Sequence, residues 1–327
     1  MRLAVTGSIA TDHLMTFPGR FTDQLIPDRL STVSLSFLAD GLEVRRGGVA
    51  ANIAFGLGLL GHAPTLVGAA GPDFDDYRLW LKQHGVDTDH VRISETRHTA
   101  RFVCTTDQQQ NQIATFYPGA MSEAAEIDLA AVAEQAGGFD LVLIAPDDPA
   151  AMLRHTDACR RTGTPFAADP SQQLARLTQP EVRQLLDGAS YLFTNEYEAA
   201  LLLKLSGWSR REILDRVGHW ITTLGADGVR VESAGSAPVA VPAVPVARVS
   251  DPTGVGDAFR SGFLAARSWG LPLDRSAQLG CAIAAVVLGC TGTQEYRLCR
   301  GDLLHSLAEG YGPQAAADVA IAWAGPA

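Results

Sequence analysis

The sequence predicts an α/β fold in which a doubly wound, mostly parallel central sheet is flanked by helices. Three observations lead to this prediction. From residue 140 onwards, strand-like and helix-like stretches alternate, the pattern that produces parallel strands joined by crossover helices. Polar residues directly follow three of these strands, at the edge where open α/β sheets bind ligands. The 327 residues are 46% hydrophobic and 19% charged, with no repeat or linker, which favours one globular domain over residues 1–327.

The chain opens with a short strand over Leu3–Val5, followed by the loop Gly7–Asp12. This loop does not read G-x-G-x-x-G, so the dinucleotide fingerprint of a nicotinamide dehydrogenase is missing where a Rossmann fold would carry it. Asp12 lies just beyond the carboxyl end of the strand. It is either a turn former or a carboxylate that accepts hydrogen bonds from ligand hydroxyls.

Residues 33–45 alternate polar and apolar side chains, which predicts a second strand. The pair Gly47-Gly48 then opens a helix and allows close approach of the backbone to a ligand. Asn52 falls in the first turn of that helix. A capped surface helix is the alternative interpretation, but Asn is a poor residue inside a helix, so a binding role is favoured.

In the middle of the chain, the sequence predicts a strand over 65–71, a helix over 75–84 and a β-hairpin formed by 99–106 and 111–117. Beyond it, polar segments follow the strands of the alternating region at 169–173, 194–198 and 223–228. The predicted strands there are Asp140–Ala145, Pro165–Ala168, Tyr191–Phe193 and Trp220–Leu224, and the helices lie near 149–162, 179–187, 196–205 and 209–217.

Asp251–Asp257 reads as a glycine turn that opens a helix. Gly254 and Gly256 permit a left-handed backbone or a close approach to a ligand. The free N–H groups and the dipole of a helix start attract anions, phosphate above all. Asp257 stands at the same point, where it is either the helix N-cap or the base that accepts a proton from an attacking hydroxyl.

Composition excludes several other classes of protein. The net charge of −10 and pI of about 5.2 argue against a basic surface that would bind nucleic acid or an anionic membrane. The five cysteines are scattered and never spaced C-x-x-C, which argues against a disulfide framework or zinc site and suits the cytoplasm. The N-terminus turns glycine-rich too early for a signal peptide, and the apolar run 277–288 is too short to span a bilayer.

Two of these motifs, in this order and about two hundred residues apart, resemble the signatures of the ribokinase-like (PfkB) carbohydrate and nucleoside kinases. Asp251–Asp257 resembles the family's Asp-Thr-x-Gly-Ala-Gly-Asp, with Pro252 in place of Thr and Val255 in place of Ala. Gly47-Gly48 followed by Asn52 resembles its first signature. The resemblance implies the ribokinase-like fold, with a small β-sheet lid built from strands near 12–18, 32–45 and 98–118.

The resemblance also implies a role for each motif. Asp257 is the catalytic base and Gly254 to Asp257 form the anion hole. The ribose hydroxyls bind Asp12, Gly48 and Asn52. ATP binds along Asn195, Thr223, Gly225, Gly228 and Gly256, with Mg²⁺ held by Asn195 and Glu198 largely through water. Glu198 is otherwise a solvated acid favoured by the helix dipole. Ser171 departs from the Asn that the family often has there, which weakens a phosphate role for 169–173.

In the family the lid closes over the sugar and pairs between subunits, so the resemblance implies a homodimer. Phe102 and Phe116 fall on the hairpin, where they either stack on a purine base or pack in the core of that dimer. Arg176 either approaches the base or a phosphate, or forms a surface ion pair. The loop Thr291–Glu295 borders the adenine of ATP in relatives, and a K⁺ site there is a hypothesis.

Longer stretches, among them Val5–Met15, Asp169–Leu177 and Thr291–Glu295, are most similar to the actinobacterial branch of adenosine kinases within this family. That likeness implies adenosine as acceptor, ATP as donor, and substrate contacts at Ser8 and Ser36. Other nucleosides, ribose or fructose are alternative acceptors. A catalytically silent nucleoside-binding protein is a further alternative, which loss of the carboxylate or the anion-hole glycines would indicate, and both are present.

Overall fold

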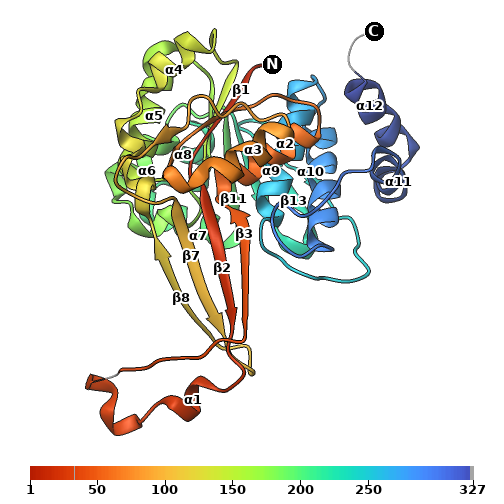
Figure 1. Ribbon diagram of the computed structural model, residues 1–327. Helices are drawn as coiled ribbons and strands as arrows, with labels where there is room; N and C mark the ends of the chain where they lie inside the picture. Colours follow the sequence, from red (N-terminus) through yellow and green to blue (C-terminus); the bar gives the residue numbers. More distant parts are fainter. Residues whose placement is uncertain (33, 325–327) are drawn as a thin grey trace.

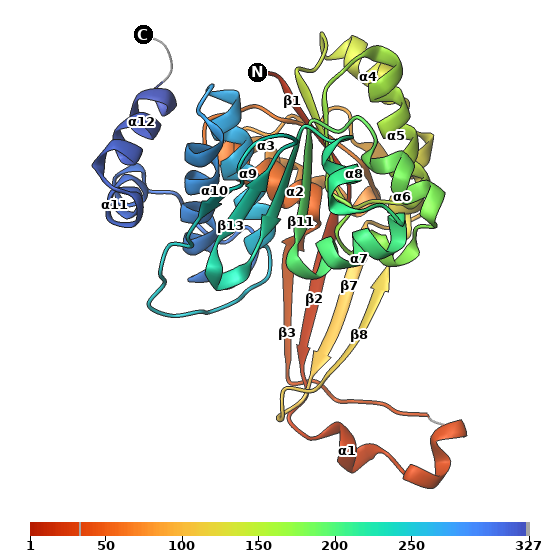
Figure 2. The ribbon, with the colours of Figure 1, turned by 180° about the vertical axis from the view of Figure 1, so that it is seen from behind.

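A computed structural model describes residues 1–32 and 34–324 of the chain. Its centre is an eight-stranded sheet with the strand order β14-β13-β12-β11-β10-β9-β1-β4 (Figures 1 and 2). The six strands from β12 to β4 in this order are parallel, whereas at the other edge β13 pairs antiparallel with β12 and β14 pairs antiparallel with β13. The strands are β1 (Leu3–Thr6), β4 (Thr65–Val67), β9 (Leu141–Ile144), β10 (Phe166–Ala168), β11 (Tyr191–Asn195), β12 (His219–Thr223), β13 (Val229–Glu232) and β14 (Val239–Val241).

Helices cover both faces of this sheet, which confirms the predicted fold class. Along β9, Leu141 and Leu143 pack into one core while Val142 and Ile144 pack into the other, because successive side chains of a strand point to opposite faces. The first core is covered by α2 (Val49–Leu59), α3 (Asp75–Gln83), α9 (Val255–Ser268) and α10 (Leu273–Leu288), with α11 (Arg300–Tyr311) and α12 (Pro313–Trp323) outside them. The second core is covered by α4 (Leu129–Gln135), α5 (Pro149–Thr162), α6 (Gln179–Leu186), α7 (Glu196–Ser206) and α8 (Arg210–Leu214), which are in front in Figure 2.

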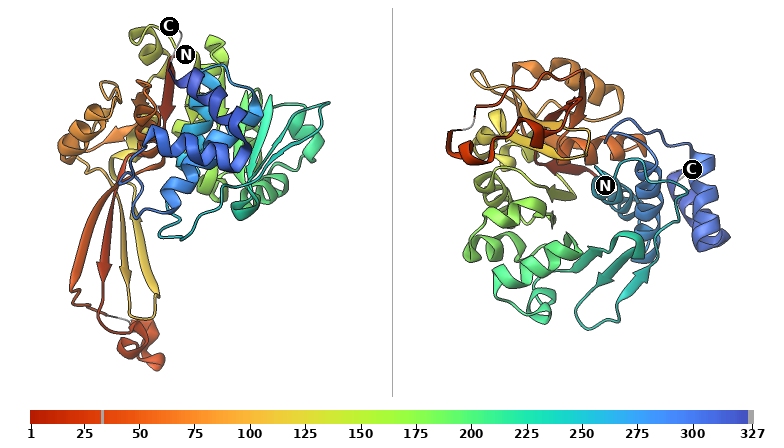
Figure 3. Two further views of the ribbon diagram at one scale, coloured as in Figure 1. Left: turned by 90° about the vertical axis from the view of Figure 1, so that its right-hand side faces the viewer. Right: turned by 90° about the horizontal axis from the view of Figure 1, so that it is seen from below.

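A second sheet projects from this body and is called the lid sheet below (Figure 1; Figure 3, left). Its strand order is β3-β2-β7-β8, and the predicted hairpin forms its last two strands. At its far end a short excursion, α1 (Phe21–Gln24) and a 3₁₀ turn (Pro27–Thr32), is held by packing of Phe17, Phe21 and Phe37. The strands are β2 (Ala10–Thr16), β3 (Gly41–Gly47), β7 (Ala100–Thr106) and β8 (Gln112–Tyr117).

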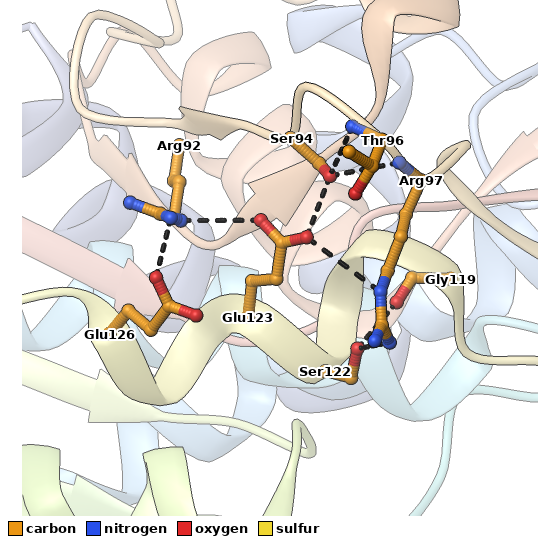
Figure 4. Close-up of polar contacts among 8 residues, drawn as sticks. All are labelled: Arg92, Ser94, Thr96, Arg97, Gly119, Ser122, Glu123 and Glu126. Atoms are coloured by element: carbon orange, nitrogen blue, oxygen red, sulfur yellow. Dashed lines mark hydrogen bonds and ion pairs between the residues drawn. The ribbon is translucent and has the colours of Figure 1, made fainter.

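An ionic cluster ties together the two chain segments that enter and leave the β7–β8 hairpin (Figure 4). Glu123, in the 3₁₀ segment Gly119–Glu126 after β8, accepts a hydrogen bond from Ser94 Oγ at 2.7 Å. The same carboxylate pairs with Arg92 at 3.4 Å and Arg97 at 3.8 Å, both before β7. The base of the hairpin is therefore fixed to the body, while at its tip Asp107 accepts a hydrogen bond from the Phe21 N–H of the excursion at 3.0 Å.

Two predicted strands differ from the structure. The strand expected over 33–45 is β3 alone, and residues 34–40 are irregular, because at the far end of the lid sheet they have no neighbouring strand to pair with. Val33 lies outside the described residues. The strand expected over 65–71 is interrupted at Gly68, where a side chain would meet the carbonyl oxygen of Gly7 at 2.5 Å. Its second part, β5 (Ala69–Ala70), pairs with β6 (Arg92–Ile93) instead.

The four helices predicted between 149 and 217 are present as α5 to α8, and the apolar run 277–288 lies in the helix α10. The antiparallel strands β13 and β14 were not predicted. Among the described residues, no helix is both long and apolar enough to cross a membrane.

Candidate active site

Helix α9 begins at a glycine that the geometry requires. Gly254 is the N-cap residue with φ of 76°, and a Cβ there would lie 2.8 Å from Cγ2 of Thr293, so a side chain would add both strain and a clash. Gly256 lies inside the helix and is not left-handed; a Cβ there would meet Arg260 Nη1 at 2.9 Å. Asp257 is in the first turn, so its interpretation as the N-cap is wrong.

Two cavities meet at Gly254 and Asp257. The first, of about 600 Å³, brings together residues from the lid sheet, α2 and α9 that are far apart in sequence. The second, of about 720 Å³, lies along the carboxyl ends of β10, β11 and β12. The first contains the predicted residues Ser8, Asp12, Gly48, Asn52, Phe102, Phe116, Arg176, Gly254 and Asp257. The second contains Asn195, Glu198, Thr223, Gly225, Gly254, Gly256 and Asp257.

The carboxylate of Asp257 is therefore placed between two spaces that could each hold a substrate. Asn52 Nδ2 donates a hydrogen bond to Asp257 Oδ2 at 2.9 Å. Burial raises the pKa of Asp257 to about 7, and the bond from Asn52 and the charge of Arg260 oppose the rise. A carboxylate with a pKa near neutrality is well matched to accept and release a proton.

Asp12 lies inside strand β2, in the wall of the first cavity, so its interpretation as a turn former is wrong. A Cβ at Gly47, on the neighbouring strand, would lie 2.9 Å from Asp12 Oδ2. Burial raises the pKa of Asp12 to about 6, against the attraction of Arg45 and together with the repulsion of Asp251. Asp12 is therefore largely ionised at neutral pH and can accept hydrogen bonds from two hydroxyls.

The start of α2 is built for close approach. Gly48 has φ of 92°, and a Cβ there would lie 2.6 Å from the backbone of Ser8 and Ala10. Ser8 Oγ accepts a hydrogen bond from the Val49 N–H at 3.0 Å. Asn52, in the first turn of α2, is buried and lines the first cavity, as the sequence predicted.

In the second cavity, Asn195 and Glu198 cap helix α7 reciprocally. The Glu198 N–H donates to Asn195 Oδ1 at 2.7 Å, and the Asn195 N–H donates to Glu198 Oε2 at 2.8 Å. Within the part of the chain that the structure describes, no three His, Cys, Asp or Glu side chains are grouped to hold a metal ion on their own. Asn195 and Glu198 fit an Mg²⁺ ion that is bound directly by phosphate oxygens and several waters. The two side chains would then contact the ion through those waters.

A third, smaller cavity of about 150 Å³ adjoins the second and is mostly apolar. Thr223 and Gly225 line both of them, whereas Gly228 lines only the smaller one. Gly228 has φ of 92°, and a Cβ there would lie 2.1 Å from the carbonyl oxygen of Val241. The remaining walls come from the segment after β14 and from α9 and α10, namely Ala243, Val244, Val255, Gly256, Phe259, Cys281, Ala284, Ala285 and Leu288.

One predicted residue is not brought to these cavities. Ser36 is exposed on the excursion at the far end of the lid sheet and lines none of the three. Phe116 lines the first cavity but remains 48% exposed, so both interpretations of the lid phenylalanines stay open.

The sequence alone did not indicate three buried residues of the site. Arg260 is paired with Asp169 at the end of β10, with Nε–Oδ2 at 2.5 Å and Nη2–Oδ1 at 2.6 Å. Gln173 lines the first cavity, is only 6% exposed, and its Oε1 has no hydrogen-bond partner among the described residues. Gln294 contacts Asn52. Gln173 and Gln294 fall in the segments 169–173 and Thr291–Glu295 that the sequence pointed out, but neither residue was given a role of its own there. For Arg260 the local signal was its position in the first turns of a mostly apolar helix.

Several known proteins are similar to this chain. A solved structure of the nucleoside kinase of Burkholderia thailandensis in complex with inosine has 32% sequence identity and a TM-score of 0.82, covering 95% of this chain and 98% of that one. The nucleoside kinase of Methanocaldococcus jannaschii is 29% identical over 251 residues, 76% of this chain and 80% of that protein. The ribokinase of Bacillus subtilis is 27% identical over 297 residues, 89% of this chain and 94% of that protein.

These relatives act on nucleosides or on a free sugar, so they identify a class of kinase rather than one acceptor. Residues 8–298 match the pfkB family carbohydrate kinases, and the matched range includes both cavities and the lid sheet. Taken with the shared fold, this match shows that the chain belongs to the pfkB family of carbohydrate kinases.

Proposed function

We propose that this protein is an adenosine kinase, which transfers the γ-phosphoryl group of ATP to the 5′-hydroxyl of adenosine and yields AMP and ADP. The observation that carries the proposal is the position of Asp257, at the junction of a cavity of about 600 Å³ and one of about 720 Å³. In-line transfer brings the acceptor hydroxyl against the γ-phosphorus, so a base that takes the hydroxyl proton has to lie where the two substrates meet. Asp257 lies where the two cavities meet, and a pKa of about 7 suits it to accept and release that proton.

The first cavity has the features of a nucleoside site. Asp12 and Asn52 offer hydrogen-bond acceptors and donors for ribose hydroxyls, and Gly48 lets the backbone approach them. Phe102 and Phe116 provide aromatic faces for a base. The unpartnered Oε1 of the buried Gln173 fits an N–H donor on a purine, because an unpaired buried acceptor is costly. Arg176 lines the same cavity.

ATP would lie along the second cavity, with its adenine in the adjoining apolar cavity of about 150 Å³ and its phosphates toward Gly254. Asn195, Thr223, Gly225 and Gly256 line this route, and Gly228 lines the adenine end. When bound, Mg²⁺ would neutralise phosphate charge; Asn195 and Glu198 would hold its water shell. The loop Thr291–Glu295 and the backbone before Gly254 are the proposed K⁺ ligands.

The chemical step follows from this arrangement. Asp257 takes the proton of the 5′-hydroxyl as that oxygen forms a bond to the γ-phosphorus, and the bond from phosphorus to the bridging oxygen of ADP breaks. The free N–H groups at the start of α9 stabilise the negative charge on the transferring group. Closure of the lid sheet over the nucleoside would exclude water, which would otherwise compete as the attacking group.

We also propose a homodimer through the lid sheet. Four apolar side chains on one face of its outer strands are exposed by 44–62% and form an apolar surface that a second copy could cover. They are Leu42, Val44, Ile113 and Tyr117.

Inosine is the second candidate acceptor, because the Burkholderia thailandensis relative was solved with it. Assays with adenosine, inosine, guanosine, ribose and fructose, each with ATP and Mg²⁺, separate the candidates by kcat/KM. Adenosine is expected to be preferred, and a higher kcat/KM for any other acceptor would replace it in the proposal. Asp257→Asn is expected to lower turnover by at least ~10²-fold with nucleoside binding largely intact; normal turnover would refute the base assignment.

A further inference from the structure

Gln294 lies after α10 in the loop Thr291–Glu295, which is proposed above to bind K⁺, but its side chain has no role in the function proposed so far. Its side chain is 1% exposed, and it lies behind the wall of the first cavity rather than in it. It nevertheless hydrogen-bonds to Asn52, whose other amide atom contacts Asp257. We propose that Gln294 is a positioning residue that fixes the orientation of the Asn52 amide, so that Asn52 presents an N–H donor to the base Asp257. This inference rests on the proposed role of Asp257.

The orientation of Gln294 is determined by its own neighbours. Trp80 Nε1 lies 3.2 Å from Gln294 Oε1, and an indole N–H can only donate. Oxygen of the amide must therefore face Trp80, and the amide NH₂ must face the other way. Both of its protons then have acceptors, Tyr77 Oη at 2.5 Å and Asn52 Oδ1 at 2.9 Å.

Tyr77 gives a second, independent constraint. Its hydroxyl donates to the carbonyl oxygen of Gly47 at 2.9 Å. With that proton in use, Tyr77 Oη can only accept from Gln294. Trp80 and Tyr77 are three residues apart and lie on the same side of α3. One helix thus imposes a single orientation on Gln294.

The fixed orientation of Gln294 also fixes the orientation of the Asn52 amide, which contacts the base Asp257. Because Gln294 offers Asn52 a donor, Asn52 must turn its Oδ1 toward Gln294 and its Nδ2 toward Asp257 Oδ2, at 2.9 Å. Each residue therefore donates a hydrogen bond to the next: Trp80 to Gln294, Gln294 to Asn52, and Asn52 to Asp257. Tyr77 and Asn52 are each only 5% exposed, so water has little access to replace a missing partner.

Without Gln294 the Asn52 amide could rotate by half a turn and place its carbonyl oxygen against the carboxylate. That contact is repulsive for ionised Asp257 and favourable for the protonated form. The donated hydrogen bond and the charge of Arg260 oppose the rise that burial and the charge of Asp169 cause in the pKa of Asp257. Substitutions at Gln294 leave Arg260 and Asp169 in place. Loss of the hydrogen bond should then move the pKa upward, leaving less of the base ionised at neutral pH.

The test is the pH dependence of kcat/KM for adenosine in Gln294→Met and Gln294→Leu. Both replacements are close to Gln in size, carry no charge, and cannot donate a hydrogen bond to Asn52. We expect the acidic limb of the profile to move upward by at least about 0.5 pH unit, and kcat/KM at pH 7 to fall about five-fold or more with partial recovery at pH 9. Trp80→Phe, which frees Gln294 to rotate, should move the limb in the same direction by less.

Tyr296→Phe is the matched control, since it removes one buried polar atom from the same loop without touching this chain of donors. Its limb should stay at the wild-type pH. If the Gln294 variants lose activity equally at every pH, with an unmoved limb, Gln294 only supports the fold and the inference is wrong. Asp257→Asn distinguishes that result from failure of the proposed function: an inactive Asp257→Asn keeps the base assignment, whereas a fully active one removes both.

Discussion

Arg260 and Asp169, ninety-one positions apart, form a buried ion pair with two contacts of 2.5 and 2.6 Å. It joins the first turns of α9 to the carboxyl end of β10. Arg260 Nη1 also donates to the carbonyl oxygen of Gly256 at 3.0 Å. Burial raises the pKa of Asp169 to about 6, still below neutrality because Arg260 opposes the shift. The pair therefore holds the turn that carries Gly254 and Asp257 against the sheet.

Arg260→Leu should destabilise the protein and impair the site together. Removal of one partner leaves a buried carboxylate uncompensated, which typically costs about 3–5 kcal/mol. We expect a lower Tm at pH 7.5, by calorimetry, and a lower kcat. The double variant Arg260→Leu/Asp169→Leu should regain part of the Tm but not the kcat. A single variant as stable as wild type would show that the ion pair does not hold the turn.

The pH profile of kcat/KM should have an acidic limb near pH 7. Asp257 must be ionised to accept a proton, and burial raises its pKa to about 7. Activity should therefore fall as the pH drops through that value and reach a plateau above it. Asn52→Ala removes the hydrogen bond that opposes the rise, so its limb should lie at higher pH. A wild-type limb near pH 4, the range of an unperturbed carboxylate, would contradict this.

Asp257 should also make the free enzyme less stable as the pH rises. Its pKa is about 7 when folded and near 3.9 when unfolded, so the folded state binds the proton more tightly. The stability linked to that proton is fully present below pH 4 and lost as the pH rises through 7. Asp257→Asn has no such loss. Its Tm advantage over wild type should grow from pH 5 to pH 8, and a constant difference would contradict the assigned pKa.

The fold was accessible from the sequence because it depends on periodicity over long segments. The alternation after residue 140 and the two glycine motifs are local patterns, and the structure places both motifs at one site. Arg260, Gln173 and Gln294 were not accessible, because each is defined by a partner ninety or more positions away or by an empty space. The irregular segment 34–40 was mistaken for a strand for the same reason: alternation describes a side-chain pattern, not the presence of a neighbouring strand.

The two lid phenylalanines should both affect nucleoside binding. Phe102 and Phe116 are directly opposite each other in the β7–β8 register and both line the first cavity, so they lie on one face of the lid sheet. Phe102→Ala should raise the KM for adenosine about ten-fold, since base stacking is worth about 1–3 kcal/mol. Phe116→Ala should raise it by less, because Phe116 is 48% exposed. Both variants should leave the dimer unchanged in sedimentation velocity, and a variant that changes only the dimer would show that its ring packs between subunits.

Substitution of Gly254 tests the anion hole and separates the effect of backbone strain from the effect of a steric clash. Gly254 and Gly270, at opposite ends of α9, have φ of 76° and 81°. A Cβ at Gly270 would meet nothing within 4 Å, whereas one at Gly254 would lie 2.8 Å from Thr293 Cγ2. Both Ala variants bear the left-handed penalty of about 1–2 kcal/mol, but only Gly254→Ala should displace the turn.

We therefore expect Gly270→Ala to lower Tm with kcat retained, and Gly254→Ala to lower kcat at least ten-fold, by loss of aligned N–H donors. Thr293→Ser removes the methyl group in question and keeps the hydroxyl that donates to the carbonyl oxygen of Arg46 at 2.9 Å. Gly254→Ala/Thr293→Ser should recover a measurable part of kcat. Equal loss in the single and double variants would mean that the backbone conformation of residue 254, rather than its contact with Thr293, sets the position of the anion hole.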